Sequence, residues 1–469
     1  MTFDLSPSTS CPVCGAPVSE SQQFCGTCGS GLRGQRARTR RRVVVTGLGA
    51  VSSVGLTARE SWGSILKGKS GIKRIPYLQE GNYSCQVRGD LDMDRLPQRF
   101  LDSKTARNTS QFSLWLLEAS GAALISAGLI DDEGNPLFDL LQGGTVIGTC
   151  VGGCYDDLLP AYDTFNTRGH DKLSPHLHVK FPLNMASYSV QWRFGMGGPS
   201  NTVSTACATG TQAIGEAFHI VQSGIAPLMV AGASESTVHP MGVAGFSAMR
   251  ALVTDSNENP EEALRPFDAT RAGFALGEGA GALVLEDYDF ALARGAKVFA
   301  EIVGFASSND AFHPIAPQPD GVGAARAIAA ALADAGVTPE QIGHIQAHAA
   351  STPAGDIAEA RAIHQIYGGL APSIPVMSVK GNIGHCMGGA GAIETAMGIL
   401  SIAEQVVPPT ANYKNPDPEI GLDVVHGAPR AHEFEYMAKH GFGLGGQNAA
   451  LIITRPPAEF AHQTSKDLA

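Results

Sequence analysis

The sequence predicts an α/β protein in which buried strands are covered by helices. Short apolar runs alternate with longer segments of helical periodicity from residue 43 to residue 455. The chain of 469 residues is 43% hydrophobic and only 16% charged, which provides for a large core and excludes a mainly disordered protein. The 56 glycines follow no three-residue period, so they indicate tight turns and close backbone packing.

The apolar runs have the length of strands that are buried on both faces. They lie at Val43–Thr46, Thr145–Gly148, Val203–Thr205, Leu228–Ala231, Ala282–Glu286, Phe299–Val303, Ile345–Ala347 and Ala450–Thr454. Helical segments lie between them at residues 110–127, 208–223, 322–335, 356–368 and 390–404. Two of these, 208–223 and 390–404, are rich in Ala and Gly and poor in charge, which predicts buried helices. Both follow a strand and a turn, which indicates an internal duplication.

Charge and cysteine content both change near residue 42. Residues 1–42 carry six arginines against Asp4 and Glu20, which is a net charge of +4. Because the whole chain has a net charge of −11, the remaining residues carry −15. Four of the nine cysteines lie within the first 28 residues. We therefore expect a small separate module at 1–32, an Arg-rich linker at 33–42 and the main body from 43, with a polar, flexible tail at 456–469.

The N-terminal cysteines form two CxxC pairs, Cys11 with Cys14 and Cys25 with Cys28, ten residues apart. Four thiolates in this spacing complete a tetrahedral Zn²⁺ shell, so the segment resembles a short zinc ribbon with a structural metal. So few residues cannot bury enough surface to fold alone, and metal binding would supply the folding energy. The alternatives are two disulfides or a redox-active pair. A cytoplasmic location favours zinc over disulfides.

Several functional classes are excluded or disfavoured by the sequence. It contains no apolar stretch of 18 residues and no secretory signal, so we expect a cytoplasmic protein without a membrane span. A net charge of −11, and arginines without interleaved aromatic residues, argue against a nucleic-acid partner. Gly47 and Gly49 begin a dinucleotide-binding pattern, but Ser52 occupies the place of its third glycine.

Cys207 lies between an apolar strand and a small-residue helix, in the segment 203–210 (VSTACATG). At a helix N-terminus the dipole and free N–H groups favour the thiolate, so we expect a lowered thiol pKa. Two further segments place imidazoles in turns, His348 in 343–356 and His385 in 378–385, which also contains Lys380. A nucleophilic thiol with two imidazoles suits covalent acyl transfer with oxyanion stabilisation.

These segments resemble the β-ketoacyl-[acyl carrier protein] synthase family. The segments 265–268 (RPFD), 273–279 (GFALGEG) and 441–448 (GFGLGGQN) match it in the same order, so the resemblance runs from about Val43 to Thr454. It is closest to the elongating condensing enzymes of type II fatty acid and polyketide synthesis. It implies a thiolase-like fold of five αβαβα layers, built from two related halves at 43–292 and 293–455.

The resemblance also implies the reaction and the residues that perform it. Cys207 would hold the acyl chain as a thioester, and His348 and His385 would stabilise the enolate formed as malonyl thioester loses CO₂. Lys380 and Glu394 would form a supporting ion pair. Leu444, with Phe442 beside it, would supply an oxyanion-hole N–H and the gate to the acyl pocket. Catalysis would need no cofactor. The expected partners are acyl carrier protein and a second copy of the chain, with a heterodimer of related subunits as the alternative.

Four residues depart from the family pattern, one of them Gly381, which stands in place of a common serine. Ala350 and Ile315 stand where the family has threonines, and Leu444 replaces a phenylalanine that controls acyl access. These changes affect specificity and leave the acyl chain, its length and the pathway open. They also keep two alternatives open. One is a ketosynthase-fold acyltransferase that does not use malonate, and the other is a non-catalytic subunit like a chain-length factor.

Overall fold

A computed structural model describes residues 40–92, 94–237 and 239–460 of the chain. The chain divides into two compact units, Met1–Arg41 and Arg42–Ala469. The expected zinc ribbon, its four cysteines and residues 33–39 of the expected linker lie outside the described residues, as does the end of the expected tail at 461–469. Among the described residues, Phe460 is buried and packs its ring on Tyr288.

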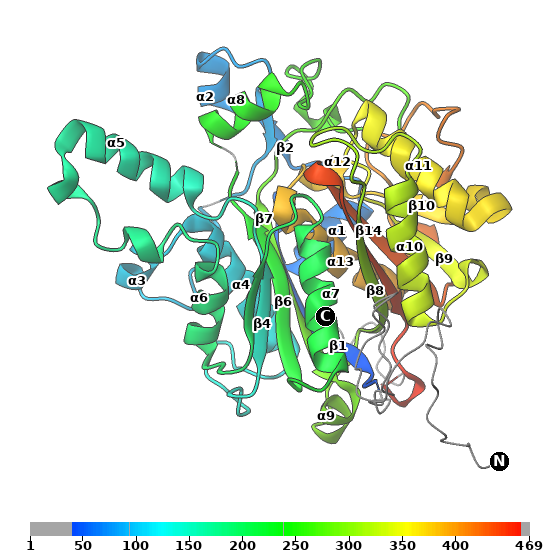
Figure 1. The fold of residues 1–469 in the computed structure, drawn as a ribbon, viewed down its shortest axis with the longest axis horizontal. Coiled ribbons are helices and arrows are strands. Elements are labelled where there is room, and N and C mark those ends of the chain that lie inside the picture. The colour runs from blue at the N-terminus through cyan, green and yellow to red at the C-terminus, as the bar shows by residue number, and fades with distance from the viewer. Residues whose placement is uncertain (1–39, 93, 238, 461–469) are drawn as a thin grey trace, which may run out of the picture. The chain divides into compact units, whose positions relative to one another are not determined.

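In the described part of the chain, eleven strands form one mixed sheet in the order β12-β10-β9-β14-β15-β8-β1-β7-β6-β4-β5 (Figure 1). Their bounds are β1 Val43–Val51, β4 Gly144–Gly148, β5 Ser200–Val203, β6 Leu228–Glu235, β7 Gly279–Asp287, β8 Ala300–Asn309, β9 Ile342–Gln346, β10 Pro375–Met377, β12 Asp423–Val424, β14 Tyr436–Gly443 and β15 Gln447–Thr454. Two small ribbons pair β2 (Ile72–Arg74) with β3 (Val87–Gly89), and β11 (Val406–Val407) with β13 (Arg430–Ala431).

The α-helices of the described residues are α1 Ala58–Leu66, α2 Pro76–Glu80, α3 Ser103–Arg107, α4 Gln111–Ser126, α5 Leu159–Arg168, α6 Met185–Phe194, α7 Thr209–Gln222, α8 Pro240–Ala248, α9 Tyr288–Ala293, α10 Val322–Ala335, α11 Pro353–Tyr367, α12 Lys380–Ile383 and α13 Met387–Glu404. The five helices expected from periodicity are α4, α7, α10, α11 and α13. No α-helix of the described residues is long and apolar enough to cross a membrane.

The sheet consists of two halves with the same topology, as the fold prediction requires. In the first half β5, β4 and β6 run parallel, and β7 and β1 follow antiparallel. In the second half β10, β9 and β14 run parallel, and β15 and β8 follow antiparallel. The chain enters the five strands of each half in the same order. The halves join where Val43–Val45 of β1 pairs with Ala300–Ile302 of β8.

Helices form three layers around the two halves of the sheet. Helices α4 and α6 cover the first half, and α10, with α11 packed on it, covers the second (Figure 1). Helices α7 and α13 contact strands of both halves and each other, so they form the central layer. A Cβ added at Gly210 would lie 2.5 Å from the Ala392 nitrogen, and one at Gly391 would lie 2.4 Å from the Thr211 nitrogen. The small residues of these two helices therefore permit their close approach, which confirms the thiolase-like five-layer prediction.

Two local predictions differ from the structure. The strand expected at Val203–Thr205 ends at Val203, because the following residues turn and Ala206 adopts a positive φ of 49°. Strand β14 escaped the apolar-run criterion because Lys439 and His440 interrupt it, although both are fully buried.

Candidate active site

Cys207 lies in the tight turn that joins β5 to α7. The turn is held by the Thr205 backbone N–H, which donates to Thr209 Oγ1 at 2.7 Å, and by the positive φ of Ala206. Strand β14 ends against this turn, where a Cβ on Gly443 would lie 2.8 Å from the Cys207 nitrogen. Glycine at this position therefore lets the loop carrying Leu444 approach the backbone of Cys207, a residue that is 7% exposed.

The pKa of the Cys207 thiol is raised to about 11, contrary to the lowered value expected from its place before a helix. Burial is the largest cause, while the Lys380 ammonium and a hydrogen bond from the Leu444 backbone N–H act in the opposite direction. Removal from water outweighs these local favourable groups. The resting group at neutral pH is therefore the thiol, and its proton must leave during acyl transfer.

His348 lies just beyond β9, and its main chain is held from two sides. Its N–H donates to Glu359 Oε1 of α11 at 2.8 Å, and its carbonyl accepts from Lys380 Nζ of α12. Lys380 Nζ also lies 3.5 Å from His348 Nδ1. Burial lowers the His348 pKa well below 6.5, with further lowering by Lys380, His385, Lys439 and His440. A neutral imidazole beside an ammonium accepts through Nδ1, which places its proton on Nε2.

His385 lies in the turn between α12 and α13. Its N–H donates to Ala275 O at 2.9 Å, and its ring packs edge-on against Phe274, with centroids 5.1 Å apart. The His348 ring is its other neighbour, at a centroid distance of 5.5 Å. Burial, followed by the Lys380 charge, lowers the His385 pKa well below 6.5. Both imidazoles are therefore neutral near pH 7.

Lys380 and Glu394 form the ion pair that the sequence predicts, with Nζ 2.5 Å from Oε1. A third charged group joins this pair, because Lys439 Nζ of β14 lies 2.9 Å from Glu394 Oε2. Both lysines are fully buried. Sequence reasoning missed Lys439, and also His440 and Glu359, which pair at 3.1 Å. Two adjacent polar residues inside an otherwise apolar strand were the available signal.

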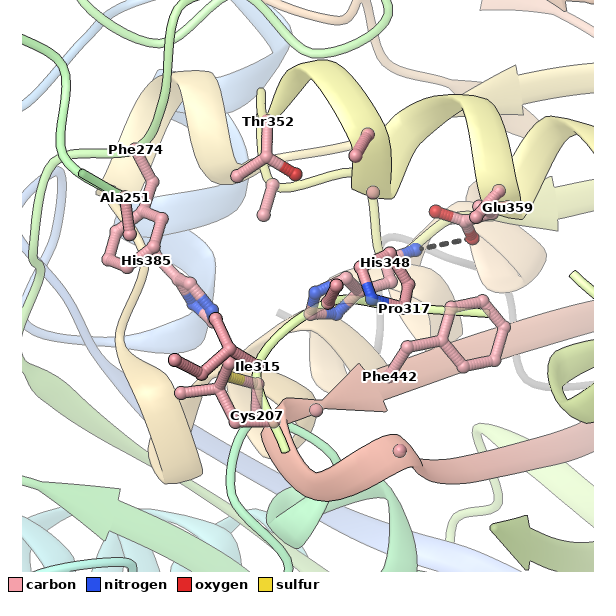
Figure 2. Close-up of a pocket in the computed structure, with 18 of the residues that line it drawn as sticks. Cys207, Ala251, Phe274, Ile315, Pro317, His348, Thr352, Glu359, His385 and Phe442 are labelled. Carbon is pink, nitrogen blue, oxygen red and sulfur yellow. Dashed lines mark hydrogen bonds between the residues drawn. The ribbon is translucent and has the colours of Figure 1, made fainter. Parts of the chain in front are cut away.

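The three predicted chemical groups line one cavity of about 360 Å³ (Figure 2). Figure 2 shows the side chains of Cys207 and His385 directed toward each other and His348 beside them, with Phe442 next to His348. Leu444 lines the same cavity. Lys380 and Glu394 do not line it, and Lys380 contacts His348 from outside the cavity.

The rest of the cavity wall is mainly apolar. It includes Phe246, Phe274, Ile315 and Ala350, with Thr352 as a remaining hydroxyl. Three of the four residues that depart from the family pattern, Ile315, Ala350 and Leu444, thus line the same cavity, and Gly381 does not. An apolar channel leading to a buried thiol suits a substrate with a long, weakly polar arm.

The other cysteines of the described residues lie outside the cluster of Cys207, His348 and His385. Cys85, Cys150, Cys154 and Cys386 are free thiols within the described residues. Cys150 Sγ contacts Ala206 O at 3.1 Å and supports the turn before the nucleophile.

Two further histidines, His344 and His313, have local structural roles. His344 is buried in the core with its Nδ1 2.9 Å from Pro375 O, and burial lowers its pKa to about 4. His313 Nδ1 accepts from the N–H groups of Ile315 and Ala316, so it shapes one wall of the cavity.

A fold of two duplicated halves with a thiol and two imidazoles at its centre defines an acyl-transferring condensing enzyme. The family profiles "Beta-ketoacyl synthase, N-terminal domain" and "Beta-ketoacyl synthase, C-terminal domain" match residues 40–291 and 299–414. The chain belongs to the beta-ketoacyl synthase family.

Individual relatives agree with this assignment. The chain is 42% identical over 418 residues to 3-oxoacyl-[acyl-carrier-protein] synthase 2 of Synechocystis sp., covering 89% of this chain and 98% of the relative. It is 40% identical over 419 residues to the protein of the same name from Vibrio cholerae, covering 89% and 100%.

Solved structures have the same fold. A beta-ketoacyl synthase from Burkholderia phymatum superposes with a TM-score of 0.82 at 32% identity, covering 89% of this chain and all of that one. A type II polyketide ketosynthase, solved in complex with its acyl-carrier protein and bound to a hexaketide, gives 0.81 at 31% identity with the same coverage.

Proposed function

We propose that the protein catalyses decarboxylative Claisen condensation of an acyl thioester on Cys207 with a malonyl-carrier extender, giving a β-ketoacyl product. The observation that carries this proposal is the convergence of Cys207, His348 and His385 on one cavity. A thiol alone would serve acyl transfer, whereas two neutral imidazoles beside it suit stabilisation of an enolate. The relatives named as 3-oxoacyl-acyl-carrier-protein synthases support the same reaction.

The first half-reaction loads the acyl chain. Cys207 loses its proton, and its sulfur attacks the acyl carbonyl of the carrier thioester. The bond from that carbon to the carrier sulfur then breaks, and the carrier thiol leaves with a proton. Lys380, which lowers the Cys207 pKa, favours the transient thiolate. The backbone N–H groups of Cys207 and Leu444 are the proposed donors to the tetrahedral oxyanion.

The second half-reaction forms the new carbon–carbon bond. The N–H groups of His348 and His385 donate to the malonyl thioester carbonyl, and CO₂ leaves as the electron pair of its bond moves into the enolate. The carbanion attacks the acyl-Cys207 carbonyl, the C–S bond breaks, and Cys207 regains a proton from solvent. Neutral imidazoles suit this step because they stabilise the enolate without protonating it. Lys380 contributes by holding His348 in the Nε2–H tautomer.

The proposed substrate donor is an acyl carrier protein, and the proposed location is the cytoplasm. The exposed Arg250 at the cavity wall offers a cation for an acidic carrier or its phosphate. A related ketosynthase is described in complex with its acyl-carrier protein. The relatives include 3-oxoacyl-[acyl-carrier-protein] synthases and a type II polyketide ketosynthase, so the acyl chain is to be determined by experiment.

We propose a homodimer, with a heterodimer of related subunits as the alternative. Strand β5 ends the sheet and leaves one side of its backbone unpaired by another strand of the described residues. On the neighbouring α6, Tyr188 and Trp192 are 50% and 54% exposed. An open sheet edge beside exposed aromatic side chains suits association. A purified single chain that measures as a monomer by light scattering would contradict the homodimer.

The four N-terminal cysteines are proposed to hold one structural Zn²⁺, on the evidence of their spacing alone. The module would then dock a partner and take no part in the chemistry. Metal content of the purified full chain provides the first test.

Intact-mass spectrometry with acyl-carrier and malonyl-carrier substrates tests the reaction. The protein should gain the acyl mass on Cys207, and the Cys207→Ala variant should not. Addition of malonyl carrier should then release CO₂ and a β-ketoacyl carrier. Acyl loading without CO₂ release would favour the acyltransferase alternative, and absence of loading would favour a non-catalytic subunit.

A further inference from the structure

Strand β14 carries two adjacent buried polar residues, Lys439 and His440. Both have no exposed surface, and their neighbours Met437 and Ala438 are equally buried. Successive side chains of a strand point to opposite faces of the sheet. Lys439 accordingly reaches Glu394 of α13 in the central layer, and His440 reaches Glu359 of α11 in the outer layer.

The contacts of Lys439 complete a buried trio. Its Nζ lies 2.9 Å from Glu394 Oε2, and Lys380 Nζ lies 2.5 Å from Oε1 of the same carboxylate. Lys439 Nζ also donates to the carbonyl of His440. Glu394 alone already neutralises Lys380, so a structural ion pair does not require the second lysine. Its burial without a role would be costly.

His440 serves the second carboxylate. The His440 Nδ1 atom lies 3.1 Å from Glu359 Oε1. Glu359 also accepts hydrogen bonds from the backbone N–H groups of His348, at 2.8 Å, and of Ala349, at 2.7 Å. Burial raises the Glu359 pKa, but His440 and these two backbone donors outweigh it and lower the pKa below its ordinary value. The carboxylate is therefore ionised at neutral pH, and it holds the loop that carries His348.

These contacts meet at the main chain of His348. Its N–H is bound by Glu359, which His440 orients, and its carbonyl is bound by Lys380, which Glu394 and Lys439 orient. We propose that Lys439 and His440 are positioning residues for His348, because this one dipeptide ties together the two carboxylate networks that fix the imidazole from opposite sides of the sheet. The inference rests on the proposed condensation reaction.

The charge balance of the site makes the role of Lys439 measurable. The charges of Lys380 and Lys439 balance those of two carboxylates when all four groups are ionised. The groups that face His348 are Lys380 of α12, His385 after it, Glu359 of α11, and Lys439 and His440 of β14. Loss of the Lys439 charge leaves the cluster negative, which favours protonation of His348 and removes its ability to accept from Lys380.

The test uses Lys439→Met in the full chain, with separate assays of the two half-reactions. The variant keeps the ion pair of Lys380 and Glu394, whose two charges cancel, so it should fold. Acyl loading, measured by intact mass, should stay close to wild type. CO₂ release from malonyl carrier should fall roughly ten- to a hundredfold at pH 7, as small misplacements of catalytic groups do. Decarboxylation is lost at low pH as His348 becomes protonated. The acid limb of the pH–rate profile for CO₂ release should therefore move to higher pH in the variant, by about one unit.

Matched variants separate positioning from general damage. Lys439→Arg restores a cation and should recover both the rate and the acid limb. Lys414→Met removes an exposed lysine paired with Glu262 and should change neither. If Lys439→Met does not fold, His440→Ala and His440→Asn decide. Asparagine keeps a donor for Glu359, so it should retain decarboxylation that alanine loses.

Two results with Lys439→Met would overturn the inference. One is wild-type decarboxylation and an unmoved acid limb in Lys439→Met. The other is an equal loss of loading and decarboxylation with the acid limb unmoved, which indicates structural damage alone. With the His440 variants, equal rates of decarboxylation by His440→Ala and His440→Asn would contradict the positioning role of His440. A wild-type protein that releases no CO₂ refutes the proposed function instead, before any variant is made.

Discussion

Replacing Glu394 by glutamine removes the counter-ion that Lys380 and Lys439 share. The Glu394 side chain is 2% exposed and both lysines are fully covered, so neither ammonium can reach water without a change in the fold. The substituted amide still accepts a hydrogen bond but carries no charge. Breaking a buried ion pair by removing one partner costs about 3–5 kcal/mol, because the other charge stays buried and unpaired. We expect a loss of this size in the free energy of unfolding at pH 7.

Urea unfolding followed by tryptophan fluorescence measures this loss, since Trp62 and Trp115 are buried. The double variant Glu394→Gln/Lys439→Met buries one lone cation instead of two, so it should be less destabilised than the sum of the single variants by about 1–3 kcal/mol. Glu262→Gln, in an exposed pair with Lys414, is the matched control and should cost less than about 1 kcal/mol.

The loss should also depend on pH. Burial and Lys380 lower the Lys439 pKa below 10.5 in the wild type, while Glu394 raises it, so removal of Glu394 lowers it further. Between the lowered Lys439 pKa of the folded variant and the ordinary lysine pKa of the unfolded chain, the unfolded chain binds more protons, so stability rises with pH until the unfolded lysine titrates. The deficit of Glu394→Gln should therefore shrink as the pH approaches 10.5. A deficit below about 1 kcal/mol at pH 7 would refute the buried charged trio.

Three further predictions concern the reaction and the N-terminal module. His348→Ala or His385→Ala should block CO₂ release more than acyl loading, and wild-type decarboxylation should persist to well below pH 6.5 because both imidazole pKa values are lowered; equal loss of the two half-reactions in either variant would contradict this division. Leu444→Phe should narrow the range of acyl chains loaded, by mass spectrometry of mixed acyl carriers, because a larger ring would occupy the cavity wall; an unchanged profile would place the gate elsewhere. Deletion of residues 1–42 should remove one zinc per chain and leave turnover of a small thioester mimic unchanged, while turnover of the carrier-bound substrate falls and salt weakens the difference; lost activity on the mimic would make the module part of the catalytic body.

Much of the architecture and the chemical groups of the site were predictable from local sequence. The helices α4, α7, α10, α11 and α13 follow from apolar periodicity, and the small residues and low charge of α7 and α13 indicated that these two helices are buried. Cys207, His348 and His385 stand out because each lies in a turn beside such a helix or a buried strand. Periodicity and turn residues are properties of neighbouring positions along the chain, so the sequence by itself determined them.

Burial and distant contacts were decided by the tertiary structure. The sequence placed Cys207 before a helix and so predicted a lowered pKa, but desolvation by segments remote in the chain raises it to about 11. In the sequence, Lys439 and His440 interrupt an apolar run. In the structure they lie in strand β14, where Lys439 pairs with Glu394 on one face of the sheet and His440 pairs with Glu359 on the other. A buried charge is tolerated only where a partner is brought to it, and the pairing of remote segments is set by how the two halves pack.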